Sequence, residues 1–288
     1  MRPYGPGVRS PLRSADPGAG NVGETGVVRV TVATFNLRNG RGLDGRNLWW
    51  FRRRNALRVV LGLDADILAL QEVRPGQLSW LRRRLADRYE MYAVGRDDGV
   101  RRGEHMVVAA RRSIGAARAV VPRWFTDTPS VPGRHPDARF NRMALAVTFV
   151  IGGGSVDVVC THLDERPGTA QRDAVTRLVG WHPGTAVLLG DFNCTIDDPV
   201  LAPLLACGYV DALAPLPAAG PGIATHHSFR GTIDGTRIDH ILVPRSVRVV
   251  AGRIVHAHPP GPLPSDHWPV VAVLEFPDPA TGDPATPA

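Results

Sequence analysis

Polar side chains that could do chemistry stand at the ends of several apolar runs in this chain. The segment "VLLGDFN" (187–193) is a short apolar run that ends in Asp191 and Asn193, with Phe192 between them. Residues two apart in extended backbone point to the same side, so we expect the carboxylate and the amide to face one place while Phe192 turns back into the core. A solvated strand end explains this segment equally well when it is taken alone.

The same pattern recurs along the chain, which favours a shared site. A single polar residue at a strand end is usually a hydrogen-bonded structural residue. Sheet packing, however, can bring many strand ends together along one rim, and we therefore expect one polar site built from distant segments. Nine carboxylate, amide and imidazole groups lie at the edges of apolar runs: Asn36, Glu72, Glu104, His162, Asp191, Asn193, Asp239, Asp266 and His267.

These residue types suit metal-assisted hydrolysis of a phosphoester. The carboxylates of Glu72 and Asp266, with an amide oxygen from Asn36 or Asn193, are hard oxygen ligands of the kind that Mg²⁺ or Mn²⁺ prefers. The imidazoles of His162 and His267 could transfer protons and stabilise charge. The sequence has neither a Walker loop nor a "GxSxG" elbow, so direct attack of water on phosphorus is favoured over a covalent intermediate.

Strands and helices that must position these groups alternate for most of the chain. Because several neighbouring strands look antiparallel, we predict an α/β four-layer sandwich, in which two mixed, mostly antiparallel sheets pack face to face and helices flank them. The long connection 122–141 is expected to be a substrate-side loop. Beside the opening segment, strands are predicted at 28–37, 66–70, 89–94, 105–110, 143–150, 156–161, 237–243 and 269–276, and helices at 48–61, 77–84, 170–179 and 200–206.

The composition indicates how many domains the chain has and in which compartment the protein works. The 288 residues show no second composition block or repeat, so we predict one catalytic domain at 28–276 between disordered tails at 1–27 and 277–288. All 34 basic residues are Arg, which indicates a coding bias rather than a nucleic-acid surface behind the net charge of +7. Three cysteines without disulfide or metal spacing predict a reducing compartment, the cytoplasm, and the lack of a continuous apolar segment near the start predicts that the protein does not insert into a membrane. We also expect a monomer.

From about Arg29 to Phe276, the order of the motifs "LQE", "THLD", "GDFN" and "SDHWPV" resembles the endonuclease/exonuclease/phosphatase superfamily. Its members include deoxyribonuclease I, abasic-site endonucleases, sphingomyelinases and inositol polyphosphate phosphatases. The resemblance implies hydrolysis of phosphoesters with the help of Mg²⁺.

Roles for the metal and water follow from the same resemblance. It implies that Glu72 is the principal metal ligand, with Asn36 and Asp266 in direct or water-mediated contact. Asn36 is also expected to contact the substrate. His267 would orient or deprotonate the attacking water, and Asp239 would hold its imidazole.

Other residues would act on the phosphate. The resemblance implies that Asp191 and Asn193 position the nucleophile and a phosphate oxygen. His162, paired with Glu104 as in the deoxyribonuclease I branch, would stabilise charge on the phosphoryl group or assist the leaving oxygen.

Smaller features resemble one bacterial branch of the superfamily. They are "GRDDG" (95–99), the loop 124–133 and a "T-x-H-x-F" element at 225–229. By this likeness Arg142 and His227 are predicted to bind substrate, Arg142 as a bidentate phosphate clamp. Solvent-facing loop chemistry is the alternative for both.

The substrate stays open at this point, because specificity in such folds lies in loops around a shared site. A small phosphorylated metabolite is the leading prediction. A nuclease cutting DNA or RNA is the alternative, favoured by the basic charge and the expected pair of His162 and Glu104. An inactive binding protein on the same fold is the third, and retention of every motif residue argues against it.

Overall fold

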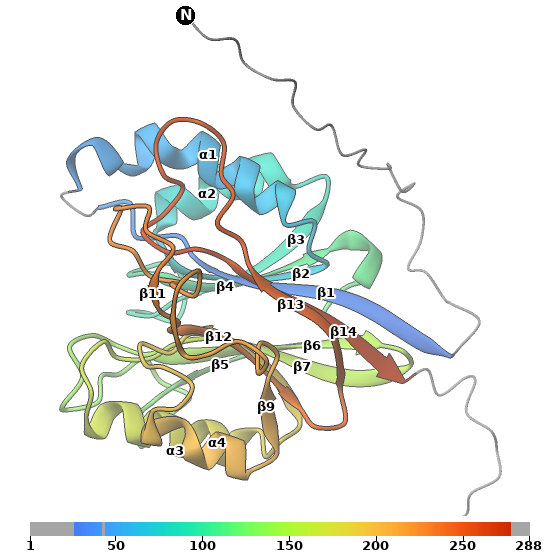
Figure 1. Ribbon diagram of the computed structural model, residues 1–288. Helices are drawn as coiled ribbons and strands as arrows, with labels where there is room; N and C mark the ends of the chain where they lie inside the picture. The colour runs from blue at the N-terminus through green and yellow to red at the C-terminus, as the bar shows by residue number, and fades with distance from the viewer. Residues whose placement is uncertain (1–25, 42–43, 278–288) are drawn as a thin grey trace, which may run out of the picture.

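Two six-stranded sheets lie face to face in the computed structural model, which describes residues 26–41 and 44–277 (Figure 1). The first sheet contains, in spatial order, β13 (Arg248–Ile254), β14 (Val270–Pro277), β1 (Val27–Asn36), β2 (Ile67–Val73), β4 (His105–Arg111) and β3 (Tyr89–Gly95). The second contains β5 (Ala119–Trp124), β6 (Met143–Ile151), β7 (Gly154–His162), β8 (Ala186–Asp191), β12 (Asp239–Pro244) and β9 (Tyr209–Asp211). A separate short pair joins β10 (Ala219–Gly220) to β11 (Gly235–Thr236).

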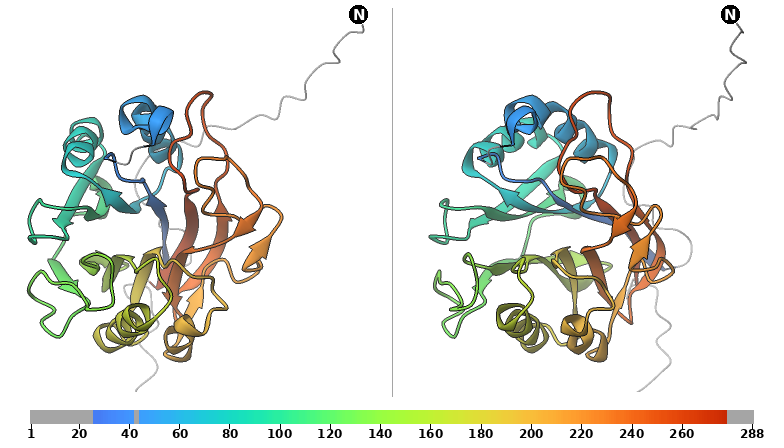
Figure 2. Two further views of the ribbon diagram at one scale, coloured as in Figure 1. Left: turned by 90° about the vertical axis from the view of Figure 1, so that its left-hand side faces the viewer. Right: turned by 60° about the vertical axis from the view of Figure 1, so that its left-hand side comes forward.

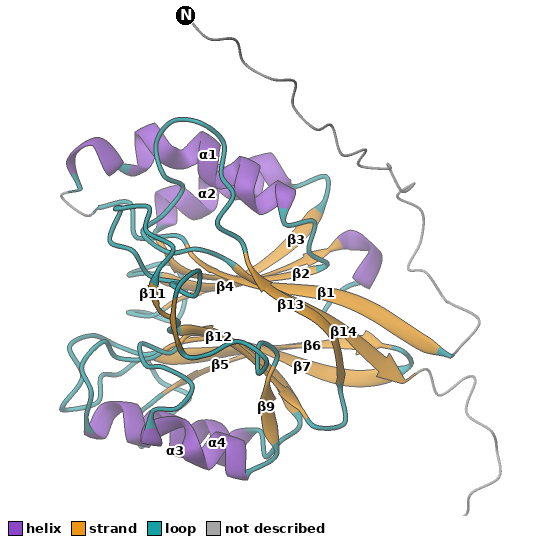
Figure 3. Ribbon diagram, in the orientation of Figure 1, coloured by secondary structure: helices purple, strands orange, loops and turns teal. Residues whose placement is uncertain are grey.

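Helices cover the outer face of each sheet and complete four layers (Figure 3). The helices α1 (Trp49–Gly62) and α2 (Pro75–Leu85) pack on the first sheet, and α3 (Thr169–Trp181) and α4 (Ala202–Ala206) pack on the second. Only β1 with β2 and β7 with β8 pair in parallel, whereas every other strand pair in the described residues is antiparallel. The predicted four-layer sandwich of two mixed sheets is confirmed. Three short 3₁₀ helices lie at Gly45–Asn47, Arg112–Ile114 and Pro199–Leu201.

Alternation along the strands decides which side chains reach the space between the sheets. In β8, Val187 and Leu189 pack into the core between the two sheets, whereas Leu188 packs under α3. The strands β1, β7 and β12 alternate in the same way. The left panel of Figure 2 views the core between the sheets end on. Four polar residues continue the inward-facing series of their strands and therefore lie at this end of the core: Asn36, His162, Asp191 and Asp239.

The sequence prediction missed three strands at the edges of the large sheets and the separate short pair. The segment 111–142, predicted to be without a strand, contains β5, and β9, β10, β11 and β13 were also unpredicted. Most residues of β5 and β13 are at least partly exposed, so these edge strands lack the apolar pattern on which the prediction depends. The predicted helix 200–206 is a 3₁₀ turn followed by the short α4.

The first and last strands lie near the limits given for the catalytic domain, whose bounds 28–276 stay a prediction. β1 begins at Val27 and β14 ends at Pro277. The predicted tails 1–27 and 277–288 otherwise lie outside the described residues. No helix of the described chain is long and apolar enough to span a membrane.

Candidate active site

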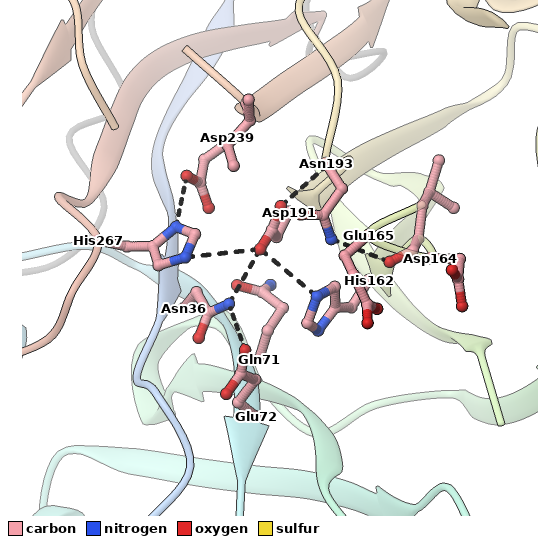
Figure 4. A network of polar contacts seen from close by, with 12 residues as sticks. Asn36, Gln71, Glu72, His162, Asp164, Glu165, Asp191, Asn193, Asp239 and His267 are labelled. Atoms are coloured by element: carbon pink, nitrogen blue, oxygen red, sulfur yellow. Dashed lines mark hydrogen bonds and ion pairs between the residues drawn. The ribbon is translucent and has the colours of Figure 1, made fainter. Parts of the chain in front are cut away.

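The carboxylate of Asp191 is the centre of a buried polar network (Figure 4). Its Oδ2 accepts a hydrogen bond from Asn36 Nδ2 at 3.0 Å, and its Oδ1 accepts one from the Asn193 backbone N–H at 2.9 Å. The Nε2 atoms of His162 and His267 lie 3.4 and 3.7 Å from Asp191 Oδ2. Residues separated by more than two hundred positions are thus brought to one place, as the sequence predicts.

A second carboxylate fixes the imidazole of His267. His267 Nδ1 donates to Asp239 Oδ2 at 2.9 Å, and both side chains are buried. Burial acts against the charged imidazole, but the carboxylates of Asp239 and Asp191 raise the pKa of His267 to about 10. Burial, together with the Asp239 carboxylate, raises the pKa of Asp191 to about 7. The imidazole and the two carboxylates therefore share protons as one coupled group.

Glu72 reaches the site through an irregular backbone. The pairing of β2 with β4 shifts register between Leu70 and Val73, and Glu72 has a φ of 61°. In a regular strand Glu72 would share the helix side with Leu70, but the bulge and the left-handed conformation redirect its side chain into the cavity. Hydrogen bonds from Asn36 Nδ2 and the Asn39 N–H outweigh burial and lower the pKa of the Glu72 carboxyl group.

The carboxylates near Glu72 suit a hard divalent cation. Glu72 and Asp266 line the same cavity, and Arg38 Nε lies 3.6 Å from Asp266 Oδ2. These oxygens match the ligands that Mg²⁺ and Mn²⁺ take in proteins. The geometry differs from the prediction at Asn36, whose amide oxygen accepts the Arg38 N–H at 2.9 Å while its amide nitrogen donates to Glu72 and Asp191. Asn36 therefore holds the two carboxylates in place rather than turning an oxygen toward a metal.

Among the residues that the structure describes, two groups of three His or Asp side chains place their possible ligand atoms within 4.8 Å of one another, and both groups contain His267. In the first group His267 is joined by Asp191 and Asp239, and the imidazole Nδ1 of His267 already donates a hydrogen bond to Asp239. That group is better described as a hydrogen-bonded network than as a ligand set. The other combines His267 with His226 and Asp266 at the cavity wall.

The network opens into a cavity of about 470 Å³ that combines predicted and unpredicted residues. Asn36 and Asp239 are buried and support the cavity-lining groups from behind. The predicted residues among its lining are Glu72, Glu104, Arg142, His162, Asp191, Asn193, Asp266 and His267. Sequence reasoning missed Arg38, Asn39, Arg96, Arg139, Phe140, Glu165, His226 and Ile238.

The expected pair of His162 and Glu104 is absent from the described structure. Glu104 instead accepts a hydrogen bond from Arg96 Nη1 at 2.5 Å, and His162 Nδ1 is buried without a hydrogen-bond partner among the described residues. Burial and the guanidinium groups of Arg142 and Arg96 lower the pKa of His162 well below its usual value. His162 therefore presents a neutral imidazole to the cavity.

The prediction that His227 binds substrate is wrong for this structure, because His226 lines the cavity instead. His226 forms an isolated antiparallel β-bridge with His267, and the side chain of His227, the next residue, therefore points to the opposite side. The ring of His227 lies 4.2 Å from that of Trp268, and its Nδ1 accepts the Gly231 N–H.

Within "GRDDG" the cavity residue is Arg96 rather than either aspartate. Asp98 Oδ1 accepts the backbone N–H groups of three residues that follow it and so fixes the turn. Arg96 follows directly on β3, and its place next to a strand end is the signal that could have identified it.

Comparisons with known proteins identify a family and agree with the fold. A model of the Endonuclease/Exonuclease/phosphatase family matches residues 33–267. An endonuclease/exonuclease/phosphatase family protein of Bacteroides thetaiotaomicron is 26% identical with a TM-score of 0.78, covering 87% of this chain and 98% of its own. A mannosyl-6-phosphatase of B. thetaiotaomicron VPI-5482 is also 26% identical, with a TM-score of 0.77 and coverage of 86% and 100%.

A more distant likeness shows the fold alone. TDP2 of D. rerio, in complex with a single-strand DNA product, is 18% identical with a TM-score of 0.64, covering 85% of this chain and 98% of that one. A search of curated proteins gave no match.

Proposed function

The chain belongs to the endonuclease/exonuclease/phosphatase family and is thus a phosphoesterase, and we propose that it uses Mg²⁺ or Mn²⁺ to hydrolyse a small phosphorylated metabolite. The observation that carries this proposal is the cavity of about 470 Å³ in which Glu72, His162 and His267 meet. A cavity of this size suits one small molecule. The likeness to a mannosyl-6-phosphatase supports a phosphorylated sugar among the possible substrates.

Residues on one side of the cavity would prepare the water molecule. Glu72 and Asp266 would hold the divalent cation, which when bound supplies charge neutralisation to the phosphate oxygens. His267, fixed by Asp239, would orient the attacking water, and the coupled group that it forms with the Asp191 carboxylate would take the proton of that water. Asp191 would share that proton through the coupled group and hold the water in line with phosphorus.

Residues on the other side would receive the phosphate. Asn193 lines the cavity, and its Nδ2 donates one hydrogen to the Leu163 oxygen at 3.1 Å, so its second amide hydrogen would be donated to a phosphate oxygen. Arg142 and the neutral imidazole of His162 would stabilise charge on the phosphoryl group and the leaving oxygen as the bond breaks. The leaving oxygen would take its proton from solvent, because neither Arg142 nor the neutral imidazole of His162 carries a proton that it can readily give up.

The nuclease alternative has weaker support. It depends on the net charge of +7, but two arginines that line the cavity are already paired, Arg96 with Glu104 and Arg142 with Glu165. A nuclease would be expected to present unpaired basic groups along a groove, with binding that weakens steeply as salt rises. We include a monomeric state and a cytoplasmic location in the proposal, and the free thiols of Cys160, Cys194 and Cys207 agree with a reducing compartment.

A substrate panel tests the proposal directly. Sugar phosphates, nucleotides, inositol phosphates, lipid phosphodiesters, plasmid DNA and RNA are each incubated with the protein in Mg²⁺ and in EDTA. Release of phosphate from a small phosphomonoester, abolished by EDTA, is the expected result. Cleavage of plasmid or RNA without phosphate release would favour the nuclease, and binding without cleavage of any ester would favour a binding protein.

A further inference from the structure

The cavity has a second wall made of guanidinium and carboxylate pairs, away from His267. Figure 4 shows Asp164 and Glu165 on the other side of Asp191 from His267. We propose that this wall is a subsite for a neutral, polyhydroxylated leaving group, so that the substrate is a phosphorylated sugar or polyol. The inference rests on the proposed phosphoesterase function and goes beyond it by assigning the recognition of the leaving group to named side chains.

Three arginines and two glutamates form the wall. Arg96 Nη1 donates to Glu104 Oε2 at 2.5 Å, and Arg142 Nη2 donates to Glu165 Oε2 at 2.6 Å. Arg139 Nη1 donates to the other oxygen of Glu165 at 3.1 Å. All five residues line the cavity. Donors and acceptors therefore alternate along one surface.

One aromatic ring organises the arginines. The guanidinium carbons of Arg96, Arg139 and Arg142 lie 4.6, 5.0 and 5.9 Å from the centroid of the Phe140 ring. Such cation–π contacts hold the planar groups in fixed orientations. Three segments distant in sequence, the 95–104 turn, the loop after β5 and the loop after β7, thus contribute to one surface.

The charges on this wall nearly cancel. The guanidinium groups of Arg96, Arg139 and Arg142 face the carboxylates of Glu104 and Glu165, and Asp164 Oδ2 lies 3.8 Å from Arg142 Nε. A second phosphate would meet these carboxylates, and like charges repel. A hydroxyl group, in contrast, donates to a carboxylate and accepts from a guanidinium at the same time. Alternating pairs of this kind match the neighbouring hydroxyl groups of a sugar ring.

The buried side chains of Arg96 and Arg142 each have a hydrogen-bond donor that is not used within the described residues. The side chains of Arg96 and Arg142 are each only 7% exposed. Their Nε atoms nevertheless lack a hydrogen-bond partner within residues 26–41 and 44–277. Buried donors are normally satisfied, and each of these Nε atoms lies 3.8 Å from a carboxylate oxygen, of Asp97 and of Asp164, so either a small shift of that carboxylate or a ligand oxygen would satisfy it.

The wall is built before any ligand arrives. The backbone oxygen of Arg96 accepts hydrogen bonds from Trp124 Nε1 at 2.7 Å and from Asn141 Nδ2 at 3.2 Å. Gly103 allows the turn to close, since it has a φ of 83° and an added Cβ would lie 2.4 Å from Asp97 Oδ2. Fixing the turn in this way removes the entropic cost of ordering it on binding.

Binding can be measured apart from catalysis. The full chain is titrated calorimetrically in EDTA with a hexose 6-phosphate, with hexyl phosphate, which carries the same phosphate without ring hydroxyls, and with a hexose 1,6-bisphosphate. We expect the hexose 6-phosphate to bind at least about tenfold more tightly than hexyl phosphate, because hydrogen bonds to charged groups are among the stronger ones. Equal affinity for these two, or tighter binding of the bisphosphate, would overturn the proposal.

Variants assign the effect to the wall. Glu165→Gln and Glu104→Gln should each reduce the preference for hexose 6-phosphate over hexyl phosphate by about tenfold. The control Glu90→Gln makes the same chemical change on an exposed part of β3 outside the cavity lining and should keep the wild-type preference. Glu165, whose side chain is 31% exposed, provides the decisive variant if Glu104→Gln fails to fold. An unchanged preference in Glu165→Gln would contradict the subsite.

Turnover separates this inference from the proposed function. A protein that prefers the hexose phosphate in the titrations but releases no phosphate from it in Mg²⁺ would contradict the function and leave the subsite standing. A protein that hydrolyses small phosphoesters but shows no preference for the hydroxylated one would contradict the subsite alone.

Discussion

His267 donates its Nδ1 proton to Asp239 over 2.9 Å, and this contact turns Nε2 toward Asp191, 3.7 Å away. The two residues belong to different segments, since Asp239 opens β12 and His267 precedes β14. Because Asp239 is fully buried, its carboxylate has no freedom to follow a displaced imidazole. The pair therefore fixes both the tautomer and the direction of the ring.

Breaking this pair should remove catalysis without unfolding the protein. We expect His267→Ala to lower kcat by about 10²- to 10⁴-fold, the usual contribution of a positioned acid or base. Asp239→Asn should lower kcat in the same range, because an amide holds the imidazolium less well than a carboxylate. Steady-state kinetics on the substrate found in the panel measure both effects, and circular dichroism checks the fold. The exposed Asp87→Asn is the control, and wild-type kcat in His267→Ala would contradict the assigned role.

Glu72 gives a separate prediction about the metal. Glu72→Gln keeps the shape of the side chain but removes its charge, so the Mg²⁺ concentration for half-maximal activity should rise by at least about tenfold. Activity at varied Mg²⁺, together with Mn²⁺ binding followed by electron paramagnetic resonance, measures the change. The exposed Glu90→Gln should keep the wild-type dependence. An unaltered half-saturating concentration in Glu72→Gln would show that the cation is held elsewhere.

Much of the site could be predicted from strand alternation alone. Asp191 continues the inward-facing series of Val187 and Leu189, and the fully buried Phe192 packs beneath the helices, as expected. The same period places Asn36, His162 and Asp239. Apolar runs carry this information because burial of one strand face is a local property of the sequence.

The remaining features of the site could not be predicted from local sequence patterns, because they depend on contacts between distant segments. Strand alternation alone would turn Glu72 to the helix side, and only the bulge with its positive φ brings it into the cavity. The sequence offers both Arg96 and His162 as partners of Glu104, and the closure of the 95–104 turn brings Glu104 to Arg96. The choice of His226 over His227 likewise follows from one backbone bridge to His267.

A buried histidine outside the cavity predicts how stability depends on pH. His240 Nδ1 accepts a hydrogen bond from Arg237 Nη1 at 2.9 Å, and its Nε2 donates to the Cys194 oxygen at 2.9 Å. Burial and the neighbouring Arg237 guanidinium lower the pKa of His240 from 6.5 to about 4. Protonation would remove the acceptor and place a second cation beside Arg237.

The sign follows from the order of the two pKa values. The unfolded chain takes up the proton near pH 6.5, whereas the folded protein resists it until about pH 4, so this contribution is complete above pH 6.5 and is lost as the pH falls toward 4. The loss should amount to about 3 kcal/mol of the free energy of unfolding. Urea unfolding at pH 7.5 and at pH 4.5 measures it. His240→Gln should lose less stability between these two values than the wild type, and the exposed His258→Gln should behave like the wild type. Equal losses in wild type and His240→Gln would refute the assignment.

Gly190, the first residue of "GDFN", is required by close packing between two strands. It pairs in parallel with Thr161 of β7, and an added Cβ would lie 2.2 Å from the Thr161 oxygen and 3.0 Å from its Cγ2. The obstacle is backbone, which cannot move aside as the end of a flexible side chain can. We expect Gly190→Ala to lower the free energy of unfolding by about 1–3 kcal/mol, the usual cost of overpacking. Activity should fall as well, because the displaced strand carries Asp191.

The matched control is a glycine with open space around it. Gly180 lies in α3, and an added Cβ there meets no atom within 4 Å. Gly180→Ala should therefore raise the free energy of unfolding by up to about 1 kcal/mol, since alanine loses less backbone entropy in a helix. Urea denaturation of the two variants beside the wild type measures the opposite signs. Equal stability of Gly190→Ala and Gly180→Ala would mean that β7 and β8 can separate at no cost in free energy. Close packing would then not be the reason for glycine at position 190.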